Sequence, residues 1–383
     1  MARKKIVYCT PSLYTAGGVE RVLTSKVNYL AEKGDEYDVT MILTDGAGKA
    51  PFYPLSEKVR VINLDIGFEA LWELSFLRKI PAYLKKQRQY KRRLREELMR
   101  LRPDITISTL RREVNFITSL PDGSKKVGEL HVNRQNYRNF EANDTNVVKR
   151  LFAKWWSWRL VGKLRRLDRF VVLTNEDRLS WHELSDVTVI PNPLPKLPDR
   201  RSPLTEKRII AVGRYAYQKG FDLLLEAWSR VEKQYPDWHL TVFGAGERAP
   251  YEQLARELMP DTSRYELRGA VEDIGKEYLA SSVFVFSSRF EGFGMALLEA
   301  MSYGLPAISF DCPCGPKDIV SNGRDGMLVE SGNVAELAEA MSRMISDADL
   351  RQRLADEAVK TAREYDIKAI GKRWDELFGS LVP

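Results

Sequence analysis

Two glutamates with seven residues between them could bind a ligand that carries hydroxyl groups. Glu291 and Glu299 lie in the run Ser-Arg-Phe-Glu-Gly-Phe-Gly-Met-Ala-Leu-Leu-Glu-Ala-Met. The apolar residues 283–286 before them predict a buried strand, and the spacing of apolar residues after Glu291 predicts a helix with Glu299 on its second turn. Glu291 then lies in a glycine-rich turn at the carboxyl end of a strand, where open α/β sheets bind ligands. Because a helix start favours an anion, the pattern predicts a ligand with both phosphate and hydroxyl groups.

Two cations earlier in the chain could bind the phosphate part of such a ligand. Arg214 follows a predicted strand at 208–212, and Lys219 comes just before the next predicted helix. Cations on such a crossover can hold two phosphates from opposite sides. Lysine and arginine are also common at turns of this kind, so the pair alone leaves a purely structural role open.

The Glu-x7-Glu run resembles the signature of the retaining glycosyltransferases of family GT4, which have the GT-B fold. In that family a phosphate-binding pair of cations occupies the place that Arg214 and Lys219 have here. The resemblance extends over essentially the whole chain, and its second half carries the more specific motifs. It implies a transferase that acts on a nucleotide-diphosphate sugar, with UDP as the expected nucleotide and without a metal cofactor.

The resemblance also implies a role for each residue of the run. Glu299 is expected to bind the ribose hydroxyls and Glu291 the hydroxyls of the donor sugar. The backbone N–H groups of Phe293 and Gly294 would meet the phosphate or the sugar. Arg214 and Lys219 would stabilise the diphosphate as it leaves, which is the kind of electrostatic contribution that often dominates catalysis.

Two glycines after the first predicted strand form a second candidate binding loop. Gly17 and Gly18 stand in Thr-Ala-Gly-Gly-Val-Glu-Arg, and such a pair permits close backbone approach and positive φ. The run resembles the Gly-Gly-x-Glu/Ala-Arg loop of the family, which faces the donor diphosphate and the acceptor. A tight turn without a binding role is the alternative.

His131 is the histidine with the clearest functional position. It ends the strand predicted at 126–130, where family members place a histidine near the donor sugar, and the resemblance implies that it hydrogen-bonds that sugar. The family commonly has a Glu-His pair, whereas Leu130 separates Glu129 from His131 here. Glu129 is therefore assigned no role.

Two further segments of the second half lie near the expected site. Gly244 follows a predicted strand, in a turn that commonly borders the nucleotide base, although a simple strand-to-helix turn explains it equally well. The segment 311–316 resembles the family's turn after the Glu-x7-Glu helix and is expected to shape the sugar pocket. Asp347-Ala-Asp349 is the one Asp-x-Asp triplet, and its context predicts a helix N-cap rather than a metal site.

Strand and helix patterns alternate twice along the chain, which predicts parallel sheets covered by helices. Residues 191–203 contain five prolines and predict a linker between the two halves. We expect an α/β protein of the GT-B type, with two Rossmann-like domains that face each other across a cleft. The expected division is an acceptor-binding domain at 1–195, a nucleotide-sugar-binding domain at 205–363, and a helix at 364–383 that crosses back to the first domain. The predicted strands are 5–10, 37–43, 58–64, 104–109, 126–130, 169–173 and 187–190, then 208–212, 240–243, 283–286, 307–310 and 327–329.

Positive charge is concentrated in the first half. Residues 1–200 hold 37 Lys/Arg against 24 Asp/Glu, whereas residues 201–383 hold 23 against 29. The segments 78–102 and 149–166 carry much of the excess, with apolar residues at helical intervals, the second of them with three tryptophans. Such helices suit the surface of an anionic membrane. The alternative is that these helices pack on the sheet and that the aliphatic parts of their lysine and arginine side chains cover apolar surface.

We therefore expect a retaining, metal-independent enzyme that moves a hexosyl or N-acetylhexosaminyl group to a hydroxyl of a glycan. The preferred acceptor is lipid-linked, in cell-surface polysaccharide synthesis, with the enzyme cytoplasmic and peripheral on the inner face of the membrane. No cofactor and no nucleic-acid partner are expected. Two alternatives remain open at this point: a nucleotide-sugar epimerase on the same fold, and a non-enzymatic adaptor that binds membranes.

Overall fold

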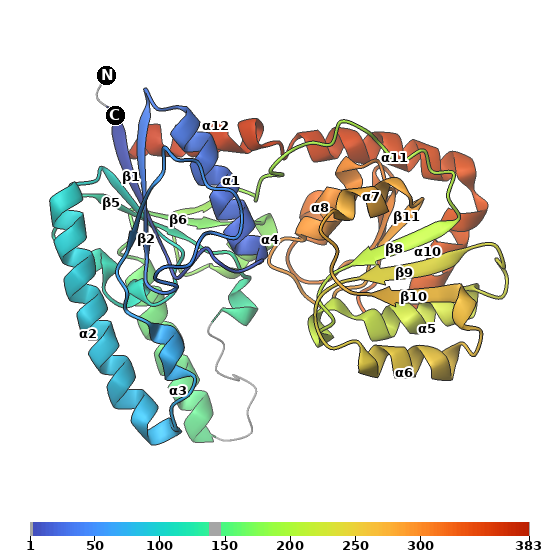
Figure 1. The fold of residues 1–383 in the computed structure, drawn as a ribbon, viewed down its shortest axis with the longest axis horizontal. Helices are drawn as coiled ribbons and strands as arrows, with labels where there is room; N and C mark the ends of the chain where they lie inside the picture. Colours follow the sequence, from blue (N-terminus) through green and yellow to red (C-terminus); the bar gives the residue numbers. More distant parts are fainter. Residues whose placement is uncertain (1–2, 138–146, 383) are drawn as a thin grey trace. The chain divides into compact units, whose positions relative to one another are not determined.

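The computed structural model describes residues 3–137 and 147–382 (Figure 1). The chain forms two compact units. Unit 1 comprises Met1–Leu173, Asp177–Pro195 and Ile367–Pro383, and unit 2 comprises Thr174–Glu176 and Lys196–Asp366. Each unit is built on one parallel sheet.

The sheet of unit 1 has seven strands in the order β3-β2-β1-β4-β5-β6-β7. The order reverses between β1 and β4, whose carboxyl ends therefore flank the position where such sheets bind ligands. The strands are β1 (Lys4–Thr10), β2 (Tyr37–Leu43), β3 (Arg60–Asn63), β4 (Ile105–Ser108), β5 (Lys125–Glu129), β6 (Arg169–Val172) and β7 (Val187–Val189).

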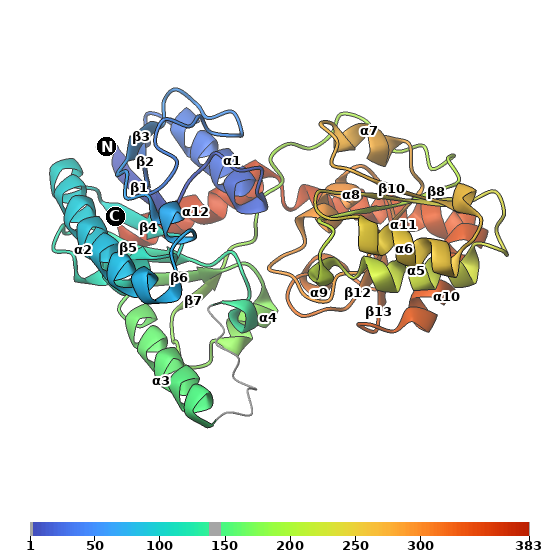
Figure 2. The same cartoon turned by 60° about the horizontal axis from the view of Figure 1, so that its bottom comes forward.

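Helices cover both faces of this sheet (Figures 1 and 2). On one face, α1 (Gly18–Glu32) contacts α12 (Ile367–Leu381). On the other face, α2 (Phe76–Leu101) packs against β1 and β2, and α3 (Val147–Leu164) packs against β6. The short helix α4 (Asn175–Ser180) follows β6.

The sheet of unit 2 has six strands in the order β10-β9-β8-β11-β12-β13 and reverses between β8 and β11. Its helices α5, α6 and α10 lie on one face, and α7, α8 and α11 lie on the other (Figure 1). The strands are β8 (Arg208–Val212), β9 (His239–Phe243), β10 (Tyr265–Arg268), β11 (Val283–Phe286), β12 (Ala307–Phe310) and β13 (Gly326–Val329). The helices are α5 (Phe221–Val231), α6 (Ala249–Leu258), α7 (Ile274–Leu279), α8 (Met295–Ser302), α9 (Pro316–Ile319), α10 (Val334–Ser346) and α11 (Ala348–Arg363).

The two parallel α/β sheets confirm the predicted fold class, and the predicted strands agree with the structure to within two residues at their ends. The pattern of alternating strands and helices in the sequence did not predict β10. This strand lies at the edge of the sheet and reads Tyr-Glu-Leu-Arg, and only its tyrosine is fully buried. A short strand that is half exposed lacks the continuous apolar run by which its neighbours were found.

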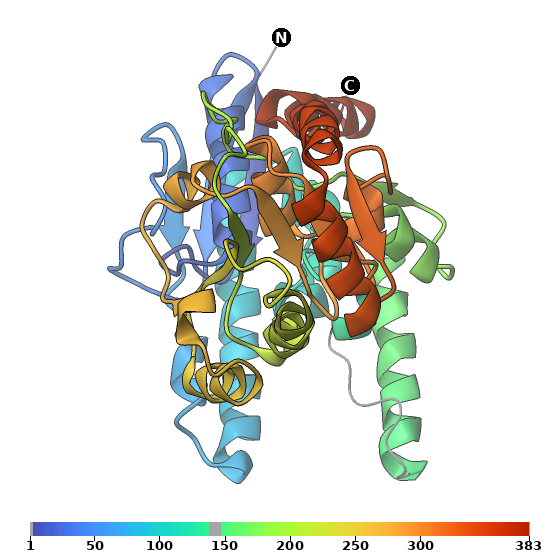
Figure 3. The ribbon, with the colours of Figure 1, turned by 90° about the vertical axis from the view of Figure 1, so that its right-hand side faces the viewer.

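The two basic helices are only partly packed. In α2, Tyr90 and Leu94 are fully buried, whereas Leu84, also part of the apolar repeat, is half exposed. In α3, Leu164 is buried but Trp158 has 72% of its surface exposed. Lys149 and Phe152 of the predicted repeat have side chains outside the described part of the chain. The N-terminal ends of α2 and α3 both extend beyond the sheet on the same side of unit 1 (Figures 1 and 3), and Ile80 of α2 and Leu151 of α3 are exposed there.

Candidate functional site

An ion pair in unit 2 joins the carboxyl ends of the two strands at which the sheet reverses. Lys219 lies in the short 3-10 turn after β8, and Glu291 lies in the loop after β11. Lys219 Nζ is 2.6 Å from Glu291 Oε1, and their side chains are 15% and 8% exposed. Gln218 donates a hydrogen bond to the carbonyl of Phe290 and so links the same two loops. The structure thus brings together two predicted site residues that are 72 positions apart in the sequence.

Glycines allow the loops around this pair to approach one another closely. A Cβ atom at Gly244 would lie 1.7 Å from the carbonyl oxygen of Gly213, so the loops after β8 and β9 meet backbone to backbone. A Cβ atom at Gly315 would lie 2.0 Å from the carbonyl oxygen of Phe293. Glu291 also donates its backbone N–H to the carbonyl of Pro313. The segment 311–316 is therefore packed directly on the Glu-x7-Glu loop.

The helix predicted after Glu291 is α8, and it begins one residue beyond Gly294. Gly294 has φ 105°, a conformation that favours glycine. Phe293 is buried and packs near the ring of Tyr365, with 5.8 Å between the ring centroids. Glu299 lies on the second turn of α8 and is half-buried. Arg214, by contrast, is exposed on the loop that carries Lys219.

In unit 1 the predicted glycine loop begins α1. Gly17 is the N-cap and has φ −93°, so it does not use the positive φ that glycine permits. A Cβ atom there would lie 1.9 Å from a carboxylate oxygen of Glu20, at the end of a flexible side chain that can move aside, so the contact does not require glycine at this position. Gly18 has open space where its Cβ would stand. Glu20 accepts a hydrogen bond from Thr15, which holds its carboxylate over the start of the helix.

A cavity of about 430 Å³ lies beside this loop, at the carboxyl ends of β1, β4 and β5. Arg111 and Arg112 line it, and the sequence analysis did not single them out. Their position directly after a strand at which the sheet reverses was the available signal. The cavity is lined by Thr10, Pro11, Val19, Glu20, Leu110, Arg111, Arg112, Val132, Asn136 and Tyr137.

His131 lies two residues beyond the end of β5, with its side chain buried. Its Nε2 is 3.3 Å from Glu129 Oε1. Burial lowers the pKa of His131 to about 4, while the carboxylate of Glu129 acts in the opposite direction. The imidazole is therefore neutral at pH 7. Glu129 had no role predicted from the sequence, and it contacts both His131 and the buried Lys26 of α1.

Other expectations concern regions outside these loops. Asp347 is the N-cap of α11 and accepts a hydrogen bond from the backbone of Leu350, which confirms the predicted cap. Across residues 3–137 and 147–382, no cluster of three His, Cys, Asp or Glu side chains is arranged to hold a metal ion. Within the same ranges, no helix combines the length and the apolar character needed to span a bilayer.

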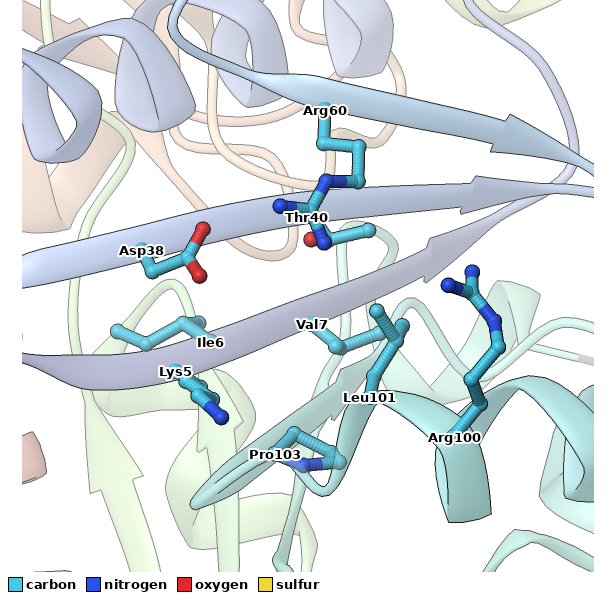
Figure 4. Close-up of a pocket in the computed structure, with 9 residues that line it drawn as sticks. All are labelled: Lys5, Ile6, Val7, Asp38, Thr40, Arg60, Arg100, Leu101 and Pro103. Atoms are coloured by element: carbon cyan, nitrogen blue, oxygen red, sulfur yellow. The ribbon is translucent and has the colours of Figure 1, made fainter.

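A smaller cavity of about 250 Å³ lies toward the opposite end of the sheet of unit 1 (Figure 4). Lys5 at the start of β1 and Asp38 near the start of β2 contribute to it, together with Arg60 and Arg100. Because it lies away from the carboxyl ends of the strands, we do not include it in the candidate site.

Comparison with known families identifies the second unit. The profile of the family described as Glycosyl transferases group 1 matches residues 196–361. The chain carries a group 1 glycosyltransferase domain. The match includes Arg214, Lys219, Gly244, Glu291 and Glu299, so the loops that meet at β8 and β11 belong to the glycosyltransferase domain.

Relatives of similar length extend the likeness beyond this domain. An uncharacterized glycosyltransferase of Haemophilus influenzae is 28% identical over 379 residues, which cover 97% of this chain and 99% of that protein. The lipopolysaccharide outer core galactosyltransferase WaaB has a TM-score of 0.76 at 18% identity, with 98% and 99% of the two chains covered. HepE of Anabaena, solved with UDP and glucose, has a TM-score of 0.72 at 18% identity, with 99% and 100% covered. Several other curated relatives are matched over half of their own length or less.

These likenesses establish the GT-B fold for the glycosyltransferase and confirm the enzyme class predicted from the sequence. The resemblance to family GT4 is likewise confirmed through the group 1 domain.

Replacing Lys219 by methionine should destabilise the glycosyltransferase because the carboxylate of Glu291 then loses its cation in a buried setting. We expect K219M to lower the free energy of unfolding by about 2–4 kcal/mol, since an uncompensated buried charge is costly. Urea unfolding at pH 7 measures the change.

The matched control for K219M is K207M. Lys207 Nζ is 2.7 Å from Asp237 in the same unit, but the two side chains are 56% and 70% exposed. K207M should change the free energy of unfolding by less than about 0.5 kcal/mol. Equal losses in the two variants would contradict the importance of burial for the Lys219–Glu291 pair.

Proposed function

We propose that this protein is a retaining, metal-independent glycosyltransferase. It transfers a hexosyl or N-acetylhexosaminyl group from a nucleotide-diphosphate sugar, with UDP as the nucleotide, to a hydroxyl of a glycan. The observation that carries this proposal is the buried Lys219–Glu291 pair between the loops after β8 and β11, directly before the start of α8. It sets a cation, a carboxylate and a helix N-terminus at the edge of the sheet where α/β proteins bind ligands.

Each of these groups suits one part of the donor. Lys219, fixed by Glu291, and the exposed Arg214 bind the diphosphate. The backbone N–H groups of Phe293 and Gly294 meet the phosphate or the sugar at the start of α8. Glu291 accepts hydrogen bonds from the hydroxyls of the donor sugar, and Glu299 accepts them from the ribose hydroxyls. Gly244 borders the base.

The charges of the site favour departure of the nucleoside diphosphate. The bond between the anomeric carbon and the phosphate oxygen breaks, and negative charge develops on that oxygen. Fixed cations stabilise this charge more in the transition state than in the bound donor, which lowers the barrier. The acceptor hydroxyl attacks the anomeric carbon from the side of the leaving group and passes its proton to the leaving phosphate, so the configuration is retained.

Unit 1 supplies the acceptor side of the reaction. The cavity after β1, β4 and β5 has room for a sugar residue, and Gly17 and Gly18 lie on the loop beside it. Arg111 and Glu20 offer it hydrogen-bond donors and acceptors. His131 hydrogen-bonds the transferred sugar as a neutral imidazole, which can both donate and accept. The acceptor is a glycan of cell-surface polysaccharide synthesis, in keeping with the named activity of the structural relative WaaB.

A membrane surface is the proposed location of this acceptor. The ends of α2 and α3 that extend beyond the sheet expose Ile80, Leu84, Trp155 and Trp158 among basic residues. Trp72, just before α2, is 75% exposed and lies under the ammonium of Lys79, 4.6 Å from its ring centroid. Exposed aromatic residues with surrounding cations suit the interface of an anionic bilayer. The enzyme therefore works on a lipid-linked glycan, peripherally at the inner face of the membrane.

Nucleotide binding is the direct test of the proposed donor site. Calorimetric titration of UDP in EDTA should show binding, because cations of the protein take the place of a metal ion. E299A should weaken it about 10- to 100-fold, since hydrogen bonds to a charged group contribute roughly 1.5–3 kcal/mol. R214A should weaken it as well.

The control variant is E339A, which removes an exposed glutamate from α10 of the same unit. It should bind UDP as the wild type does. Absence of binding in EDTA, with recovery on adding Mg²⁺, would contradict the metal-independent site. Absence under both conditions would contradict the donor site itself.

Vesicle co-sedimentation tests the membrane surface. The protein should bind vesicles that contain phosphatidylglycerol and not vesicles of phosphatidylcholine alone. W155S/W158S should reduce binding at least about tenfold, because two large apolar side chains no longer enter the interface. L179S, which changes another exposed apolar residue of unit 1, serves as the control. Equal binding of both variants, or equal binding to both kinds of vesicle, would contradict the proposal.

A further inference from the structure

A lysine ammonium group is completely buried inside unit 1. Lys26 of α1 is 1% exposed. Its Nζ contacts the carboxylate of Glu129, lies 4.2 Å from the ring centroid of Trp374 in α12 and lies 5.3 Å from that of Tyr8 in β1. A buried charge is costly unless it is paired, and a pair of apolar residues of similar size would commonly stabilise a fold as well. Stability alone therefore gives little reason for this pair.

The carboxylate of this pair also faces His131. Oε1 of Glu129 contacts Lys26 and lies 3.3 Å from His131 Nε2. Within the residues that the structure describes, neither ring nitrogen of His131 makes an aligned hydrogen bond, although Glu129 and the side chain of Asn192 lie beside the ring. Buried polar atoms are normally hydrogen-bonded, and because Nε2 faces Glu129, Nδ1 is the nitrogen left for a ligand. A sugar hydroxyl, which both donates and accepts, fits that need.

We propose that Lys26 and Glu129 are positioning residues that hold the His131 ring for the transferred sugar. This inference rests on the proposed function, in which His131 contacts that sugar. Glu129 fixes the ring by attraction to its Nε2–H, and Lys26 fixes Glu129 from the other side. Trp374 closes the buried space around the ammonium group, so the helix α12 contributes to the site through Lys26.

Charge balance gives the pair a second effect on His131. Burial, Lys26 and Arg111 lower the pKa of His131, whereas Glu129 and the side chain of Asn192 act against them. With Lys26 present, the imidazole is neutral at pH 7. Without Lys26, the carboxylate of Glu129 acts unopposed by its closest cation, and the pKa of His131 rises. An imidazolium can only donate, so protonation removes the acceptor that a sugar hydroxyl needs.

Three variants separate positioning from a structural role. K26M and E129L each leave a buried charge without its partner, so both should lower the melting temperature. Both should also lower kcat at least about tenfold, because even a slight displacement of the His131 ring slows the reaction. The double variant K26M/E129L removes both charges, so it should regain the melting temperature and keep the low kcat. The change in kcat should exceed the change in the KM for the donor, since most of the proposed donor contacts lie in unit 2 and His131 contacts only the transferred sugar.

The matched control is K33M, on the same helix. Lys33 also pairs with a residue of α12, Asp375, at 2.7 Å, and does not contact Glu129 or His131. K33M should leave kcat unchanged. Recovery of kcat together with the melting temperature in K26M/E129L would overturn the proposal.

Histidine NMR titration provides a readout that does not depend on activity. The chain has three histidines, so the His131 signal can be assigned by comparison with H131N. In the wild type it should remain neutral down to about pH 5, and in K26M it should titrate at higher pH. If the His131 titration is unchanged in K26M, the proposed role of Lys26 is overturned, whether or not the protein transfers sugar. If the titration shifts as expected but no sugar is transferred, only the proposed function is contradicted.

Discussion

Parallel strands whose order reverses within the sheet determine where the chemistry of this protein can lie. At β8 and β11 the following loops turn to opposite faces, which leaves space between them at the carboxyl edge. Lys219 and Glu291 meet in that place and hold the two loops together. The close backbone contacts at Gly213 and Gly244 and at Phe293 and Gly315 depend on the same geometry. A side chain at Gly244 or Gly315 would separate the loops that carry the charged groups.

Both units use a lysine and a glutamate that are withdrawn from water, but the two pairs differ in what surrounds them. Lys219 and Glu291 retain some exposure and lie just before the start of α8. Lys26 and Glu129 are enclosed by Trp374 and Tyr8, and the imidazole of His131 lies beside the carboxylate. The first pair suits direct contact with a ligand, and the second suits control of a neighbouring side chain. The two pairs consist of the same residue types, and the difference in their burial is what distinguishes the roles proposed for them.

The sequence predicted central strands such as β4 and β11 well because all of their residues are buried, and it also predicted the partly exposed edge strand β3. The ends of β8, β11 and β12 agree to the residue, whereas the half-polar edge strand β10 was missed. Helical spacing in α2 and α3 predicted apolar stripes but could not show that Leu84 and Trp158 lie beyond the edge of the sheet. The spacing of apolar residues identifies the apolar face of a helix, but it does not show whether another part of the protein packs against that face.

The candidate site was predictable where a motif is local and not where distant residues meet. Glu291 and Glu299 follow from one short run, and the helix between them is present as expected. Lys26 is 103 positions from Glu129, and a lysine on an amphipathic helix reads as a solvent-exposed residue. Only the packing of α1 and α12 on the sheet shows that this lysine is buried. The glycine pair likewise permits positive φ without requiring it, and the structure has φ −93° at Gly17.

The central claim is that the enzyme transfers a sugar to an acceptor with retention and without a metal. Time-resolved proton NMR of a UDP-sugar in EDTA, with and without a lipid-linked glycan acceptor, tests it directly. We expect UDP to be released at the same rate as a new glycosidic bond forms, and only when the acceptor is present. The new bond should have the anomeric configuration of the donor. Conversion of the donor to its epimer without acceptor would identify an epimerase instead, and a product of inverted configuration would contradict the mechanism.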